Sequence, residues 1–167
     1  SLFLFSGNGN MKAMFDGYKK KREKVLMAGK LNIKFPYFLC YDKNSSTLWA
    51  GGMSSYIIKT YRKDYSIKKI VRGDVVFKKE EQSVGKGRFK VETPIDKGVF
   101  FSVFKSRIYY GYIYNDEFHL DIIENNRIKK RFKSKDIRRI LTMFDQDRFV
   151  VSFNDKEYCV GIVSIQE

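Results

Sequence analysis

The fold is decided by residues 36–71, which read PYFLCYDKNSSTLWAGGMSSYIIKTYRKDYSIKKIV, together with residues 98–132, which read GVFFSVFKSRIYYGYIYNDEFHLDIIENNRIKKRF. Each segment holds four short apolar runs, separated by a polar break, a Gly- or Asn-bearing loop and a tight turn, and the last run carries paired lysines. Four short strands that recur about every 40 residues are typical of a β-propeller blade. The sequence therefore predicts an all-β propeller built from four-stranded antiparallel blades.

Incomplete copies of the same unit flank the two complete ones, and each lacks one strand. The 167 residues are therefore expected to form a single propeller region with about four blades. The expected blades are 1–26 (partial), 36–71, 98–132 and 136–167 (partial). Because the end units are incomplete, we expect the region to be part of a longer chain or to press against a partner, with Phe3, Phe5, Phe149 and Phe153 buried.

Residues 72–97 repeat neither unit. The stretch is charged and contains Gly85, Gly87 and Pro94. Two interpretations remain open: a long connection between blades, or a short helix around Lys78–Ser83 within such a connection. Long inter-blade loops often carry binding function, but they also tolerate insertions.

The chain is strongly basic, with a formal charge of +14 and a pI near 9.7. One interpretation is an anionic partner such as nucleic acid, a lipid headgroup or an acidic glycan. The other is that lysines protect the exposed outer strand of each blade from pairing with other molecules. Basic residues do recur on the last strand of each unit: Lys19, Lys20, Lys21, Arg22 and Lys24, then Lys68 and Lys69, then Arg127, Lys129, Lys130 and Arg131.

Residues suited to catalysis or metal binding are sparse. His119 is the one histidine of the sequence, and strand alternation places it with Asp121 opposite Phe118, Leu120 and Ile122. We expect it to be a packed or rim residue. The acidic pairs Asp145-x-Asp147 and Asp155-x-Glu157 are interpreted as turn residues, and Cys40 and Cys159 as small buried hydrophobes. We expect no catalytic constellation, no metal site and no cofactor, and no apolar run long enough to span a membrane.

The repeats resemble the six-bladed NHL/TolB-like propellers of bacteria. The resemblance is carried by Tyr56–Tyr61 (YIIKTY), by the basic strand Ile67–Ile70 (IKKI) and by Lys79-Glu80-Glu81 after it. It implies a closed ring of six blades, a binding role on surface loops, and a place in the cell envelope as a periplasmic or exported lipoprotein. This chain departs from the pattern, because it holds about four blades.

The leading functional hypothesis is a non-catalytic binding or scaffold module that engages a protein or glycan through loops on one face. In a propeller, the loops between second and third strands share a face with the connections between blades. The partner-binding residues expected there are Asn8, Asn10, Met53, Lys86, Arg88, Tyr114, Asn115 and Asn154.

Two alternatives remain. Some NHL-like propellers bind single-stranded nucleic acid, which would require the positive charge to cover one flat face with aromatic residues among it. The other alternative is an enzyme in the central channel, which would require two or more carboxylates, or a carboxylate and a tyrosine, converging at the ring axis.

Overall fold

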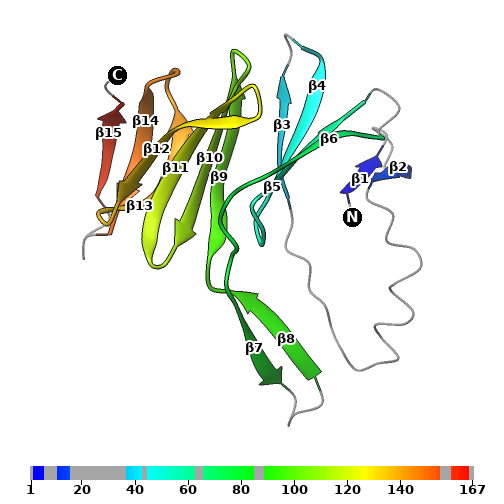
Figure 1. Ribbon diagram of the computed structural model, residues 1–167, viewed down its shortest axis with the longest axis horizontal. Coiled ribbons are helices and arrows are strands. Elements are labelled where there is room, and N and C mark those ends of the chain that lie inside the picture. Colours follow the sequence, from blue (N-terminus) through cyan, green and yellow to red (C-terminus); the bar gives the residue numbers. More distant parts are fainter. Residues whose placement is uncertain are drawn as a thin grey trace.

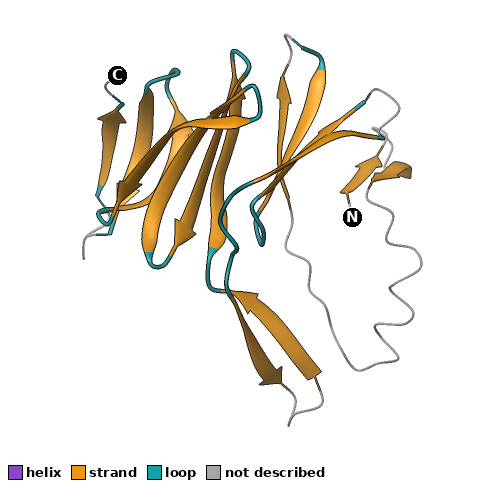
Figure 2. Cartoon of the chain, in the orientation of Figure 1, coloured by secondary structure: helices purple, strands orange, loops and turns teal. Residues whose placement is uncertain are grey.

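The computed structural model describes residues 2–5, 11–15, 37–42, 45–62, 66–84, 89–154 and 159–165. All regular elements in these ranges are β-strands, and all their pairings are antiparallel (Figures 1 and 2). The expectation of an all-β fold is confirmed. Over the same ranges, no helix has the length and apolar character needed to cross a membrane.

Three sheets and two separate hairpins make up the described part of the chain. The first sheet contains β3 (Tyr37–Asp42), β4 (Thr47–Gly52), β5 (Ile57–Tyr61) and β6 (Ile67–Arg72). The second contains β9 (Lys97–Phe104), β10 (Arg107–Tyr114), β11 (Glu117–Glu124) and β12 (Arg127–Ser134), and the third contains β13 (Ile137–Met143), β14 (Arg148–Phe153) and β15 (Val160–Ser164). The hairpins are β1 (Leu2–Phe5) with β2 (Met11–Phe15), and β7 (Lys79–Val84) with β8 (Phe89–Pro94).

Each of the three sheets is a meander, in which every strand pairs with the next one along the chain. The sheets stand side by side (Figure 1), and β9, the first strand of the second sheet, contacts β3 and β13, the first strands of its neighbours. The last strands β6 and β12 lie at the edges of their sheets. The chain thus passes from the last strand of one sheet to the first strand of the next, with the β7–β8 hairpin between the first and second sheets.

Two-residue turns set the register of the second sheet. Lys105-Ser106, Asn115-Asp116 and Asn125-Asn126 all have positive φ, between 47° and 65°. Two consecutive residues with positive φ match the right-handed twist of the strands that they join, and Asn and Asp tolerate that conformation best. The polar stretch at Glu124-Asn125-Asn126 is therefore a tight turn, as its composition indicated.

Residues 72–97 contain a β-hairpin, β7–β8, which projects away from the three sheets (Figure 1). The proposed helix around Lys78–Ser83 is wrong, because Lys79–Val84 is a strand that pairs with Phe89–Pro94. The segment Lys79-Glu80-Glu81-Gln82 has good helix formers but no apolar stripe. Pairing with the Val- and Phe-bearing strand that follows it decides the structure instead.

The core lies on both faces of the second sheet. One apolar cluster, between the first and second sheets, includes Ile58, Phe101, Tyr110 and Tyr112. The other, between the second and third sheets, includes Tyr109, Phe118, Leu120, Ile122, Ile140, Phe149 and Val151. Because both faces are covered, β10 is apolar on successive residues, and the alternating polar residues of β11, His119 and Asp121, are buried as well.

The structure corrects several expectations about which phenylalanine and cysteine side chains are buried, because it shows the face of the sheet on which each one lies. Phe149 is buried, but it packs against the second sheet of the same chain, and Phe153 is half-buried on that face. The large apolar residues that remain exposed on the third sheet are Leu141 on β13 and Val160 and Ile162 on β15. Cys40 packs partly against the first cluster, whereas Cys159 is exposed, so its assignment as a buried residue is wrong. Phe3, Phe5 and the basic residues 19–24 lie outside the part described in side-chain detail.

Candidate functional site

The loops at one end of the sheets lie against the connections that lead into β9 and β13. The amide of Gly98 donates to the Met53 carbonyl (2.9 Å), joining the β4–β5 loop to the start of β9. The amide of Asn115 donates to Asp96 Oδ1 (2.9 Å), and that of Asn154 to the Asp136 carbonyl (2.7 Å). These bonds gather the segments between second and third strands at the same end of the three sheets, which we call the loop face.

A groove of about 670 Å³ opens on the loop face. It is bounded by the starts of β9 and β13, by Phe38 of β3 and by the loops of all three sheets. Its lining combines apolar and charged side chains: Phe38, Met53, Ile95, Lys97, Gly98, Val99, Ile113, Asp116, Phe118, Ile137, Arg138, Arg139 and Asn154. We call it the loop-face groove.

The charges of the loop-face groove are predominantly positive. Among the described residues, Lys97, Arg138 and Arg139 line it together with one carboxylate, Asp116. A register shift between Ile137 and Arg139 marks a β-bulge at Arg138, and bulges at strand ends commonly re-aim a side chain. The arrangement can attract an anionic group while the aliphatic lining buries apolar surface.

Of the eight partner-binding residues predicted from the sequence, Met53 and Asn154 line the groove. Tyr114 does not, because it packs against the apolar core and meets the ring of His119 edge-on, with centroids 5.9 Å apart. Asn115 instead lies in the β10–β11 turn, and its Oδ1 accepts a hydrogen bond from Lys78 Nζ (2.6 Å). The remaining four, Asn8, Asn10, Lys86 and Arg88, lie outside the described residues.

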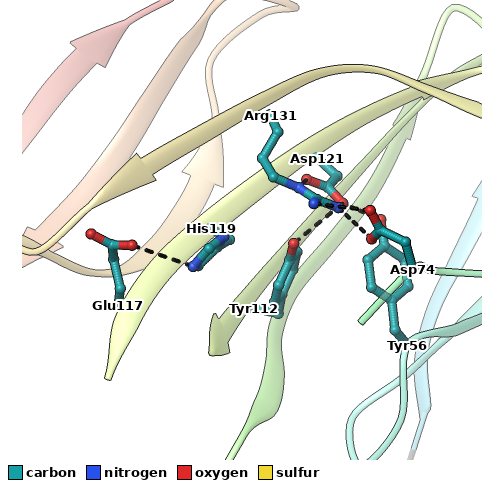
Figure 3. Close-up of polar contacts among 7 residues, drawn as sticks. All are labelled: Tyr56, Asp74, Tyr112, Glu117, His119, Asp121 and Arg131. Atoms are coloured by element: carbon teal, nitrogen blue, oxygen red, sulfur yellow. Dashed lines mark hydrogen bonds and ion pairs between the residues drawn. The ribbon is translucent and has the colours of Figure 1, made fainter. Parts of the chain in front are cut away.

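A buried polar cluster, not anticipated from the sequence, ties the first sheet to the second (Figure 3). Arg131 on β12 donates to both carboxylate oxygens of Asp121 on β11, at 2.7 and 2.8 Å. The same guanidinium donates to both oxygens of Asp74, which follows β6, at 3.1 and 2.6 Å. Asp121 is fully buried, and the Tyr56 hydroxyl donates to its Oδ2 (2.5 Å).

Tyr56 is held in this cluster by close packing around its ring. The ring stacks on Tyr110, with centroids 4.5 Å apart, and lies 5.2 Å from the ring of Tyr112. Gly73 leaves the space that Tyr56 fills, because a Cβ at that position would lie 2.1 Å from the ring. Burial and the charge of Asp121 raise the pKa of Tyr56, so its hydroxyl remains a donor at all ordinary pH.

The polar cluster ties segments of the first sheet to the second sheet through charged hydrogen bonds. Bonds from Arg131 and Tyr56 engage both oxygens of Asp121, and the hydrogen bonds from Arg131 also lower the pKa of Asp74. Throughout the described ranges, no group of three or more His, Cys, Asp or Glu side chains could hold a metal ion. Asp145 is a turn residue, as predicted: its Oδ1 accepts bonds from the amides of Asp147 and Arg148.

His119 lies beside the cluster and is 5% exposed, stacked on Tyr112 with centroids 5.0 Å apart. The expectation that alternation separates it from Phe118, Leu120 and Ile122 is correct, but its face is covered by the first sheet. Its Nδ1 is buried and has no hydrogen-bond partner among the described residues. Burial, followed by the positive charge of Lys133, lowers the pKa of His119 below 6.5, despite Glu117 at 3.6 Å from Nε2.

This shift predicts a pH-dependent stability. The unfolded chain binds a proton to His119 more readily than the folded chain, so stability is full above pH 6.5 and falls as the pH drops through that value. We expect the melting temperature to decline from pH 7.5 to pH 5.5, and His119→Gln to flatten that decline. The tie to Asp74 is lost only below its ordinary pKa of 3.8, so it does not contribute in this window. An unchanged slope in His119→Gln would contradict the assignment.

No family model, no curated protein and no solved structure matches this chain. The resemblance to NHL/TolB-like propellers therefore gains no support from these comparisons.

Proposed function

We propose that the protein is a non-catalytic binding module of β-propeller type, which holds a protein or glycan partner in the loop-face groove. The observation that carries this proposal is the groove itself. Loops of three successive sheets meet in it. Its lining is mainly apolar with a few charged side chains, which is the usual composition of a binding site. Met53 and Asn154, expected from the sequence to contact a partner, both line it.

The arrangement of the sheets supports the propeller interpretation. The inner strands β3, β9 and β13 lie together, the basic strands β6 and β12 lie at the outer edges, and the chain always leaves at an edge and returns at an inner strand. Successive blades of a propeller are connected in this way. A closed ring, of six blades by the resemblance, remains part of the proposal.

The position of the charge favours a protein or glycan over nucleic acid. Lys68 and Lys69 are exposed on β6, and Lys129 and Lys130 on β12, so these charges protect the outer edges and do not form a flat basic face. The enzyme hypothesis has less support still, because Asp116 is the one carboxylate among the described residues that line the groove, whereas glycoside hydrolysis uses a pair.

Filling the loop-face groove tests this function. Met53→Trp adds a large side chain in the groove, and Phe144→Trp adds one at an exposed site at the other end of β13. Binding of the full chain and both variants would be measured on a peptide array, a glycan array and a single-stranded RNA at two salt concentrations. We expect a peptide or glycan ligand that Met53→Trp loses and Phe144→Trp retains. Ligands lost equally in both variants, or binding to RNA alone, would overturn the proposal.

A further inference from the structure

We propose that the occupant of the loop-face groove is an extended, acidic polypeptide segment of a partner protein. Its carboxylates would meet Lys97, Arg138 and Arg139, and its aliphatic side chains would cover the apolar floor. This inference rests on the proposed function and names the chemistry of its ligand.

Among the described residues, the cations of the groove form no ion pair with a carboxylate. Elsewhere on the molecule, Arg107 pairs with Glu124 at 2.5 Å and Arg148 with Asp145 at 2.6 Å. By contrast, no carboxylate of the described residues forms an ion pair with Lys97, Arg138 or Arg139. Arg138 and Arg139 can each take a carboxylate through two parallel N–H bonds, whereas Lys97 offers a point charge.

The accessible apolar part of the lining is mainly aliphatic, with Phe38 as the one half-buried aromatic ring among the described lining residues. Ile95 is 49% exposed, and Met53 and Ile137 are half-buried, so these side chains offer surface to a ligand. The aromatic Phe118 is 4% exposed and is held in the core. A sugar ring or a nucleic-acid base packs best on an open aromatic face, which Phe118 does not offer. Aliphatic peptide side chains fit this floor better than either.

The size of the groove and its charge agree with a peptide segment. A volume of about 670 Å³ is in the range of ligand sites and holds a few side chains of an extended chain. The net charge of +14 adds long-range attraction for an acidic partner, which raises the rate of encounter without specifying the site. Specificity must then come from the groove cations.

Four fluorescent twelve-residue peptides test the inference by anisotropy against the full chain: alternating Asp-Leu, Asp-Ser, Ser-Leu and Lys-Leu. We expect Asp-Leu to bind at least about tenfold more tightly than each of the others. Arg138→Glu/Arg139→Glu should weaken Asp-Leu binding by at least about tenfold, with a loss in Met53→Trp as well. The matched control Lys129→Glu/Lys130→Glu reverses two charges on the β12 edge and should change binding by less than about twofold.

Each other outcome has a defined meaning. If Asp-Leu fails to bind, or binds no more tightly than Ser-Leu, the acidic segment is excluded. If the β12 control weakens binding as much as the groove variant, the attraction is general and the inference fails. A heparin hexasaccharide and a twelve-nucleotide oligouridine serve as competitors. If either binds the groove more tightly than the Asp-Leu peptide does, that class of ligand replaces the acidic segment in the proposal. In that case, or if Ser-Leu binding is lost in Met53→Trp, the groove is still a binding site and only the proposed ligand is wrong.

Discussion

Arg131→Met is expected to lower the free energy of unfolding by about 3–5 kcal/mol, because it leaves a fully buried carboxylate without its cation. Asp121 has no exposed surface, and Arg131 supplies two of its hydrogen bonds. Tyr56 still donates to Asp121 in the variant, but a neutral donor does not replace the lost charge. Asp74 contributes less to the loss, since its side chain is 59% exposed and regains water.

Urea denaturation of the purified chain, followed by tryptophan fluorescence from Trp49, measures the change. Lys130→Met is the matched control: it makes the same kind of substitution on the preceding residue of β12, which is exposed. Its effect should stay within about 0.5 kcal/mol. Equal stability of the two variants would show that Arg131 is an ordinary edge residue, as the sequence suggested.

A double variant separates the ion pair from other effects of the substitution. Arg131→Met/Asp121→Leu removes both charges, so the uncompensated carboxylate no longer exists. We expect it to recover part of the stability lost in Arg131→Met, although the Tyr56 hydroxyl then loses its acceptor. A further loss of stability, equal to the sum of two independent substitutions, would contradict coupling between Arg131 and Asp121.

The all-β character of the fold could be read from the sequence, because the signal for strands and turns is local. Apolar runs separated by turn residues, such as Asn125-Asn126, fix where strands of the second sheet end, and successive turns make a meander. The β7–β8 hairpin was missed because its first strand is charged and lacks alternation. Its structure depends on pairing with the strand that follows, which propensity does not report.

The buried polar cluster could not be predicted for a different reason. Arg131 belongs to a basic run on an edge strand, where the composition indicates solvent exposure, but its partner Asp74 lies 57 residues away along the chain. Alternation correctly placed His119 and Asp121 on one face of β11. It could not show that this face is covered by the first sheet rather than by water.

The groove itself was not predicted, but part of its lining lies at loop positions named from the sequence. Loop positions such as Met53 and Asn154 follow from the meander, because the turns between second and third strands fall at one end. Lys97, Arg138 and Arg139 were not anticipated, because they lie at the starts of two inner strands that meet only when the sheets pack. The bulge at Arg138 arises from the pairing of β13 with β14, and no residue type in the sequence predicts it.

Phe149→Ala is expected to lower the free energy of unfolding by about 3–5 kcal/mol, the range for removing a buried phenylalanine. The side chain is 2% exposed and its ring lies 5.8 Å from that of Tyr109, between the second and third sheets. The loss combines the transfer of the ring to water with the cavity left between two sheets that pack mainly through this cluster. Urea denaturation at fixed pH measures it.

Ile162→Ala tests the same sheet on its other face. Ile162 lies on β15, 63% exposed, and its removal should change the free energy of unfolding by no more than about 0.5 kcal/mol. A loss of more than about 2 kcal/mol would show that this face is buried in solution, against another sheet or another copy of the chain. A small effect of Phe149→Ala would instead mean that the second and third sheets do not pack as described. The pair of variants thus tests each face of the third sheet separately.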